Sequence, residues 1–212
     1  MLIAILKALL RSINWLLFRA DYVCPEKFPT QGPAIIVSNH QHTFDVFLIH
    51  AKVTPWIYWV SKKELTEKPI IGRLVKRLGV IPVDRDKSDL SAARSMFERI
   101  KEGRVIGIFP QGTRMKSKEM ISKVIPKTGA VHFAIRSGTP IYPVGIKGDF
   151  RLFRKMKIIA GDPITPEELN SKIKGDNRLM RQSIYIMKRV YELAGIEYKI
   201  EDDIVLGDTH DC

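Results

Sequence analysis

Cysteine is scarce in this 212-residue chain, which carries only Cys24 and Cys212. Two cysteines so far apart cannot build a disulfide framework, and they fit a reducing compartment. The hydrophobic fraction of 45% suffices for one full-sized core, and no repeat, low-complexity segment or compositional break indicates a second one. We therefore expect a single domain over residues 23–200, with an N-terminal segment at 1–22 and a tail at 201–212.

Acidic residues are also few: 23 Asp and Glu oppose 35 Lys and Arg, which gives a formal net charge of +12. The imbalance is larger before residue 201, because the tail itself is acidic. Its carboxylates are Glu201, Asp202, Asp203, Asp208 and Asp211. The cationic body can attract an anionic membrane surface, phosphorylated substrates or nucleic acid, and composition alone does not choose among them.

No long apolar run is free of charge. Residues 1–19 come closest, but Lys7, Arg11 and Asn14 interrupt them at a spacing that puts all three on one stripe of a helix. In a membrane span each charge near the middle would cost about 2.5–3.5 kcal/mol, and a signal peptide would carry its charges before the apolar run. We predict an amphipathic interfacial helix whose polar stripe faces lipid headgroups, and which residues 12–14 could divide in two. The alternative is an ordinary amphipathic helix packed on the domain's own core.

Strand-like and helical segments then alternate along the chain. The expected strands are 34–38, 56–60, 80–83, 105–109, 141–146 and 156–160. The expected helices lie at 46–49, 69–78, 90–100, 128–136 and 177–194, with another helix start at 165–168. Thr43 and Ser88 are candidate helix caps. This order predicts an α/β fold with a mostly parallel or mixed sheet flanked by helices, and with ligands bound outside the carboxyl ends of the strands.

His40 and Asp45 are the candidate catalytic pair, because they flank the junction between the first expected strand and the following helix. A carboxylate can accept the proton of one imidazole nitrogen and leave the other free to act as a base. That is two thirds of a Ser-His-Asp triad, so the hydroxyl is expected to come from the substrate. Three alternatives remain: His40 and Asp45 make only local loop and helix contacts, His42 is the true partner, or His40, His42 and Asp45 bind a metal.

Basic residues follow the other strands: Lys62, Arg85 and Arg114. In a parallel sheet these positions share one edge with His40, which suits an anionic substrate that also carries a hydroxyl. The loop Gln111-Gly112-Thr113-Arg114 can bind an anion, but Thr113 stands where a nucleotide-binding phosphate loop has lysine, which excludes ATP or GTP.

Two further motif observations complete the set. No G-x-S-x-G sequence is present, which excludes the common serine hydrolase arrangement. Lys127 and Gly129, before the helix at 128–136, are weaker candidates for the same substrate site.

Four ordered blocks in residues 33–147 carry a family resemblance. They are Asn39-His40 with Asp45, Gly79-Val80-Ile81-Pro82-Val83-Asp84-Arg85, Phe109-Pro110-Gln111-Gly112-Thr113-Arg114, and Ile141-Tyr142-Pro143-Val144. In this pattern the chain resembles the glycerolipid acyltransferase family, and within it the bacterial 1-acylglycerol-3-phosphate acyltransferases. The first and third blocks together are specific to it.

The resemblance implies a reaction in phospholipid biosynthesis. A fatty acyl group would pass from an acyl-carrier-protein or coenzyme A thioester to the sn-2 hydroxyl of lysophosphatidic acid, giving phosphatidic acid. Glycerol 3-phosphate or another lysophospholipid is the alternative acceptor, and a cationic membrane- or nucleic-acid-binding module is the alternative outside enzymes. No metal or cofactor is expected. The N-terminal motif would seat the enzyme, as a peripheral or monotopic protein, on the cytoplasmic face of the inner membrane.

The resemblance also implies roles for single residues. His40 would be the base and Asp45 its orienting partner, Arg85 and Arg114 would hold the substrate phosphate, and Lys62 matches a lysine common after the second strand. Backbone amides near Gly112 could hold the oxyanion. The third block usually contains glutamate where this chain has Gln111, so a strict acid or base role fails at that position, and we expect Gln111 to orient the loop or a substrate hydroxyl.

Overall fold

The computed structural model describes residues 2–84, 89–151 and 153–200, and the backbone alone of residues 2–6. Arg85, Ser88 and the acidic tail lie outside the described residues. The described chain contains a seven-stranded sheet with the order β1-β7-β6-β2-β5-β3-β4. Its strands are β1 (Asp21–Val23), β2 (Ala34–Ser38), β3 (Ile57–Lys62), β4 (Ile81–Val83), β5 (Val105–Ile108), β6 (Ile141–Lys147) and β7 (Lys157–Ala160).

Parallel pairing dominates the sheet: only the β6–β7 pair is antiparallel among the described strands, while β2 pairs in parallel with both β5 and β6. The fold expected from the sequence, an α/β fold with a mostly parallel or mixed sheet, is therefore confirmed. The central strands are buried on both faces, so Ile35, Ile36 and Ile106 show no exposed surface. Such continuous apolar runs are typical of parallel strands covered by helices.

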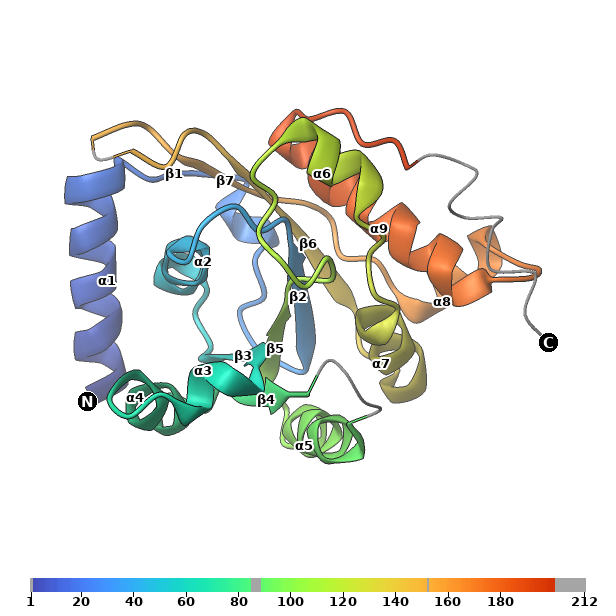
Figure 1. Ribbon diagram of the computed structural model, residues 1–212, viewed down its shortest axis with the longest axis horizontal. Helices are drawn as coiled ribbons and strands as arrows, with labels where there is room; N and C mark the ends of the chain where they lie inside the picture. The colour runs from blue at the N-terminus through green and yellow to red at the C-terminus, as the bar shows by residue number, and fades with distance from the viewer. Residues whose placement is uncertain (1, 85–88, 152, 201–212) are drawn as a thin grey trace.

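Helices cover both faces of the sheet (Figure 1). They are α1 (Leu2–Phe18), the 3₁₀ helix η1 (Pro25–Lys27), α2 (Asp45–Lys52), α3 (Lys63–Glu67), α4 (Ile71–Arg77), α5 (Leu90–Lys101), α6 (Lys118–Lys123), α7 (Gly129–Ser137), α8 (Pro166–Lys172) and α9 (Arg178–Ala194). Residues of α5, α7 and α9 pack on one face, whereas residues of α1 and α2 pack on the other. The two faces form two core clusters separated by the sheet.

Local signals placed several helix ends correctly. Thr165 caps α8 by accepting a hydrogen bond from the Glu168 amide, and Gly138 and Gly195 end α7 and α9 in the left-handed region. The expected Thr43 cap is wrong: α2 begins at Asp45, and Phe44 precedes it without a side-chain cap.

Other elements were misplaced or missed. Asp89 caps α5 by accepting from the Ala92 amide, whereas the expected cap Ser88 lies outside the described residues. The short elements β1, η1 and α6 were not expected from the sequence, since three to six residues show too little periodicity to stand out.

The N-terminal helix α1 is one continuous helix, so the expected division near residues 12–14 is wrong. Its polar stripe also faces the protein rather than lipid headgroups. Lys7 Nζ donates to the carbonyls of Val53, Thr54 and Pro55 at 2.7, 2.6 and 2.9 Å, and the Asn14 amide donates to Phe47 O at 3.1 Å.

This inward orientation has a simple physical cause. The last carbonyls of a helix lack intrahelical partners and carry partial negative charge. Arg11 therefore donates to Ala51 O in the last turn of α2, and Lys7 donates to the three carbonyls that follow this helix. The apolar residues Leu9 and Leu16 are then left exposed on the outer side of α1, at 54% and 59%, and Trp15, on the flank next to Arg11, is 75% exposed. No helix in the described part of the chain is both long and apolar enough to cross a bilayer.

Candidate active site

Asn39, the residue after β2, fixes the end of that strand through two side-chain hydrogen bonds to β6. Asn39 is fully buried, and its side-chain amide donates to Ile146 O at 2.9 Å while its carbonyl accepts from the Ile146 amide at 2.8 Å. These two bonds continue the β2–β6 pairing beyond the last residue of the strand. The chain therefore leaves the sheet at a defined point, and the next residue is His40.

His40 and Asp45 are in direct contact, with 2.8 Å between His40 Nδ1 and Asp45 Oδ2. Asp45 is fully buried at the first residue of α2, and the same oxygen accepts the backbone amides of Gln41 and His42 at 2.7 and 2.8 Å. A carboxylate held by several N–H donors is an acceptor, so His40 Nδ1 carries the proton and Nε2 is left with its lone pair. The strand-to-helix bend expected from the sequence does bring the pair together.

Within the described structure the His42 ring makes no hydrogen bond to Asp45. It stacks on Phe150 with 4.1 Å between ring centroids and on Phe44 with 5.6 Å, so only its backbone takes part in holding the carboxylate. Within the described ranges no three His, Cys, Asp or Glu side chains gather as a metal site would. His50, elsewhere on α2, is buried against Trp56, and this burial lowers its pKa to about 3.

An aromatic stack supports the other side of His40. The Phe109 ring lies parallel to the imidazole with 4.1 Å between centroids, and Trp59 stacks on Phe109 at 4.9 Å. Gly107 makes room for this stack, because a Cβ there would lie 2.4 Å from the Trp59 ring. Sequence reasoning assigned no role to Phe109 or Trp59. The position of Phe109 directly after β5 was an available signal, whereas Trp59 lies inside β3.

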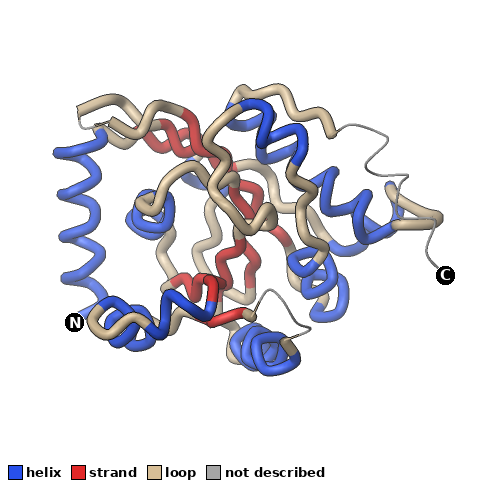
Figure 2. Tube along the Cα trace, in the orientation of Figure 1, coloured by secondary structure: helices blue, strands red, loops and turns tan. Residues whose placement is uncertain are grey.

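The loop between β5 and α6 crosses in front of the sheet (Figure 2) and is bonded to the backbone of His40. The Met115 amide donates to His40 O at 2.7 Å, and the Lys127 amide donates to Pro110 O at 2.9 Å. Gly112 has a φ of 69°, and its own amide donates to Phe109 O at 3.0 Å. The Gly112 amide is therefore engaged in the turn, and the expectation that backbone amides near Gly112 hold an oxyanion stays a prediction.

Gln111 points into the protein rather than into solvent. It is 5% exposed, and its Oε1 accepts the Tyr191 hydroxyl of α9 at 2.6 Å. Burial raises the pKa of Tyr191, so the hydroxyl keeps its proton and acts as the donor. This contact fixes the orientation of the Gln111 amide, whose Nε2 has no hydrogen-bond partner within the described structure.

The candidate phosphate-binding residues are only partly assembled in the described chain. Arg114 is exposed on the loop whose next residue is bonded to His40, and Lys62 is exposed at the end of β3, two strands away from β2. Neither forms an ion pair with a carboxylate in the part of the chain that the structure describes. Both cations are thus available to an anion at this edge, while Arg85 follows β4 outside the described residues.

A family model described as "Acyltransferase" matches residues 19–147, which include the His40–Asp45 pair, the loop after β5 and β6. The chain therefore belongs to the acyltransferase family, and it is an acyltransferase enzyme. The family resemblance seen in the four blocks is confirmed.

Similar proteins carry a more particular name. The 1-acyl-sn-glycerol-3-phosphate acyltransferase of Bacillus subtilis is 30% identical over 175 residues, which cover 79% of this chain and 84% of that protein. The enzyme of the same name from Helicobacter pylori is 33% identical over 61% of this chain, and the match spans only 54% of its length. The crystal structure of the 1-acyl-sn-glycerophosphate acyltransferase PlsC from Thermotoga maritima aligns with a TM-score of 0.66 and 25% identity, covering 93% of this chain and 81% of that one.

Proposed function

We propose that this acyltransferase moves a fatty acyl group from a thioester to the sn-2 hydroxyl of 1-acylglycerol-3-phosphate and produces phosphatidic acid for phospholipid synthesis. The observation that carries the chemistry is the 2.8 Å contact between His40 Nδ1 and buried Asp45, which leaves Nε2 as a base at a cationic sheet edge. The names of the relatives from B. subtilis and H. pylori supply the acceptor.

The proposed reaction needs no nucleophile from the protein. His40 Nε2 removes the proton of the substrate hydroxyl as that oxygen attacks the thioester carbonyl carbon. Asp45 stabilises the imidazolium that forms and holds its orientation. When the tetrahedral intermediate collapses, the carbon–sulfur bond breaks and the imidazolium returns its proton to the departing thiolate. His40 thus takes up one proton and returns it within the cycle, so the proposed reaction uses neither a metal nor an organic cofactor.

Charge stabilisation is assigned to the loop after β5 and to the neighbouring strand ends. Because the Gly112 amide is used in its turn, we place the oxyanion near the amides of Thr113 and Arg114. The side chains of Arg114, Arg85 and Lys62 would hold the acceptor phosphate. Arginine suits this role since its planar guanidinium can make two parallel hydrogen bonds to phosphate.

Both substrates carry acyl chains that reside in or near a bilayer, and we infer that the exposed side of α1 seats the enzyme there. Leu9, Trp15 and Leu16 are more than half exposed, and exposed apolar residues beside tryptophan favour the membrane interface. The seating surface is thus apolar, in contrast to the headgroup-facing polar stripe expected from the sequence. We place the enzyme on the cytoplasmic face of the inner membrane, where acyl carrier protein or coenzyme A would deliver the donor.

Mass spectrometry of the products tests this function. Lysophosphatidic acid and glycerol 3-phosphate should each be offered with an acyl-carrier-protein thioester and with a coenzyme A thioester. We expect phosphatidic acid from the first acceptor, and a loss of about 10²- to 10⁴-fold in His40→Ala, because that variant lacks the base. His42→Ala is the matched control and should lose much less.

Other results would change the assignment. Acylation of glycerol 3-phosphate alone would move the enzyme to the alternative acceptor. An equal loss in His40→Ala and His42→Ala would contradict the dyad and favour a site that uses both histidines.

A further inference from the structure

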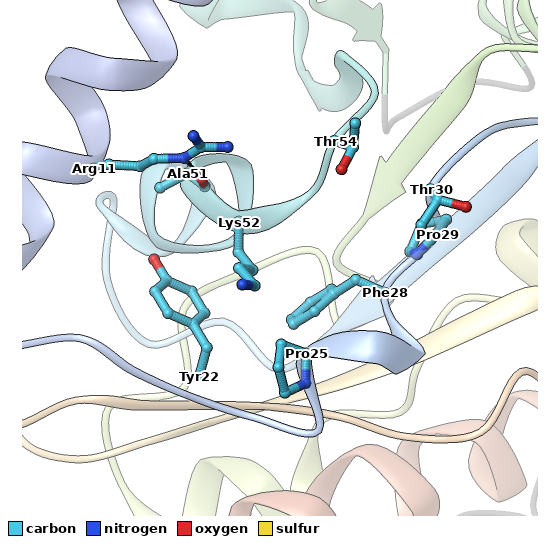
Figure 3. A pocket seen from close by; sticks show the side chains of 9 residues that line it. All are labelled: Arg11, Tyr22, Pro25, Phe28, Pro29, Thr30, Ala51, Lys52 and Thr54. Carbon is cyan, nitrogen blue, oxygen red and sulfur yellow. Dashed lines mark hydrogen bonds between the residues drawn. The ribbon is translucent and has the colours of Figure 1, made fainter.

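A second cationic site lies away from the catalytic pair, in a hollow of about 510 Å³ between α1, η1 and the C-terminal end of α2. Arg11 and Lys52 line it from the two helices, and Pro25, Phe28 and Pro29 line it from the segment around η1 (Figure 3). Asp45 is the first residue of α2 and Lys52 is the last, so roughly 10 Å of helix separates the hollow from the dyad.

The positive charge of this hollow is not neutralised by the described protein. Its lining contains no acidic residue. Arg11 uses Nε to donate to Ala51 O at 2.8 Å, an interaction with the end of α2, and this leaves its terminal nitrogens without a partner in the described chain. In the described chain the Lys52 side chain forms neither a hydrogen bond nor an ion pair, and its ammonium lies 6.0 Å from the Tyr22 ring centroid. Two cations lining one hollow attract an anion.

The surroundings indicate which anion reaches it. Trp15 lies one helical turn from Arg11, on nearly the same side of α1, and is 75% exposed. Tryptophan prefers the level of lipid headgroups, where an arginine on the next turn meets phosphates. The ring of Phe28 and the neighbouring prolines add an apolar wall, which suits the glycerol backbone of a lipid better than a fully hydrated ion.

We propose that the Arg11–Lys52 hollow binds the phosphate of a glycerophospholipid headgroup belonging to the bilayer on which the enzyme sits. The site is separate from the acceptor site, and it rests on the proposed seating through α1. One bound headgroup would hold α1 and the end of α2 together at the membrane, in addition to the apolar contact of Trp15.

Lys52→Gln is the decisive variant, because Lys52 makes no hydrogen bond whose loss would disturb the described fold. Lys101→Gln removes one exposed charge on α5 and controls for general attraction to an anionic surface. Binding of the full chain should be measured on vesicles of phosphatidylcholine with one fifth phosphatidylglycerol, and on phosphatidylcholine alone. We expect Lys52→Gln to bind the anionic vesicles about five-fold more weakly, and Lys101→Gln to change little. Arg11→Lys keeps the positive charge but loses the planar guanidinium with its paired donors, so it should also weaken binding to the anionic vesicles.

Calorimetric titration separates the sources of phosphate. Heat from monomeric dihexanoylphosphatidylglycerol that Lys52→Gln abolishes, with none from inorganic phosphate, supports the proposal. Equal Lys52-dependent heat from both would overturn the lipid occupant in favour of a free anion. Equal vesicle binding by Lys52→Gln and Lys101→Gln, with no Lys52-dependent heat, would overturn the site altogether. Failure of the wild type to bind any vesicle, with that heat retained, would contradict the seating and leave the site intact.

Discussion

Gln111 shows how one side chain connects the catalytic loop to the core. Its partner Tyr191 lies on α9, which packs against β6 and β2. Leaving a buried hydroxyl without its acceptor lowers the stability of the fold by roughly 1–3 kcal/mol. Either an amide or a carboxylate at position 111 can accept the Tyr191 hydroxyl and avoid this cost. The absent negative charge therefore need not remove the structural role of this position.

A double-mutant cycle tests that interpretation. Gln111→Leu and Tyr191→Phe should each lower the free energy of unfolding by about 1–3 kcal/mol, and the double variant should lose less than their sum because each single change strands the other polar group. Gln111→Glu is the conservative variant, since a carboxylate can still accept the Tyr191 proton, and it should retain activity within a few-fold. Urea unfolding and initial rates provide both readouts. Strict additivity would show that the two side chains act independently.

At the scale of elements, β5 is the strand that aligns the dyad. It lies between β2 and β3, so the residue that follows it, Phe109, can stack on His40, which follows β2, and on Trp59 of β3. The stack needs a glycine at position 107, because the Trp59 ring occupies the space above the strand there. A backbone feature of one strand thus determines where the imidazole can lie.

Gly107→Ala should therefore disturb the active site from inside the sheet. Its Cβ would lie 2.4 Å from a rigid ring, and overpacking of this kind typically costs about 1–3 kcal/mol. We expect a lower urea midpoint, an altered near-ultraviolet circular dichroism signal from Trp59, and a reduced transfer rate. Gly129→Ala is the matched control: a Cβ at position 129 would meet nothing within 4 Å, so stability should be unchanged or slightly raised. Identical behaviour of the two variants would contradict the packing argument.

For the whole molecule, the arrangement of α1 separates two roles that the sequence pattern combines in one helix. Buried Lys7 and Asn14 attach the helix to α2, which carries Asp45 at its other end. Leu9 and Leu16 lie on the outer side of α1 and Trp15 lies on the flank next to Arg11, and all three are exposed to a bilayer. The polar stripe thus stabilises the protein, and the apolar side is the proposed membrane contact.

Replacing Leu9, Trp15 and Leu16 together by serine should release the enzyme from vesicles while leaving the contacts of α1 with α2 in place. Activity on bilayer substrate should fall, whereas activity on a short-chain soluble acceptor should stay near the wild-type level, because partitioning rather than chemistry is lost. Leu90→Ser on α5 removes a residue that is 81% exposed and controls for lost apolar surface. Vesicle flotation measures the effect. Unchanged flotation of the triple variant would assign attachment to the cationic body instead.

Local patterns in the sequence determined the alternation of strands and helices, the ends of α7, α8 and α9, and the bend that can bring His40 to Asp45, while the family resemblance selected His40 over His42. These features depend on near neighbours: a strand-to-helix bend lies between His40 and Asp45, and Thr165 caps a helix through an amide three residues away. Such short-range geometry follows from periodicity and capping chemistry.

Tertiary structure alone decided the remaining features. The contacts of Lys7 with Val53, of Asn39 with Ile146 and of Gln111 with Tyr191 join residues far apart in the chain. The helical stripe of Lys7, Arg11 and Asn14 is equally compatible with headgroups and with the carbonyl end of another helix, because both present negative charge. Only the packing of α1 on α2 selects the second partner, and it thereby turns the apolar side of α1 outward.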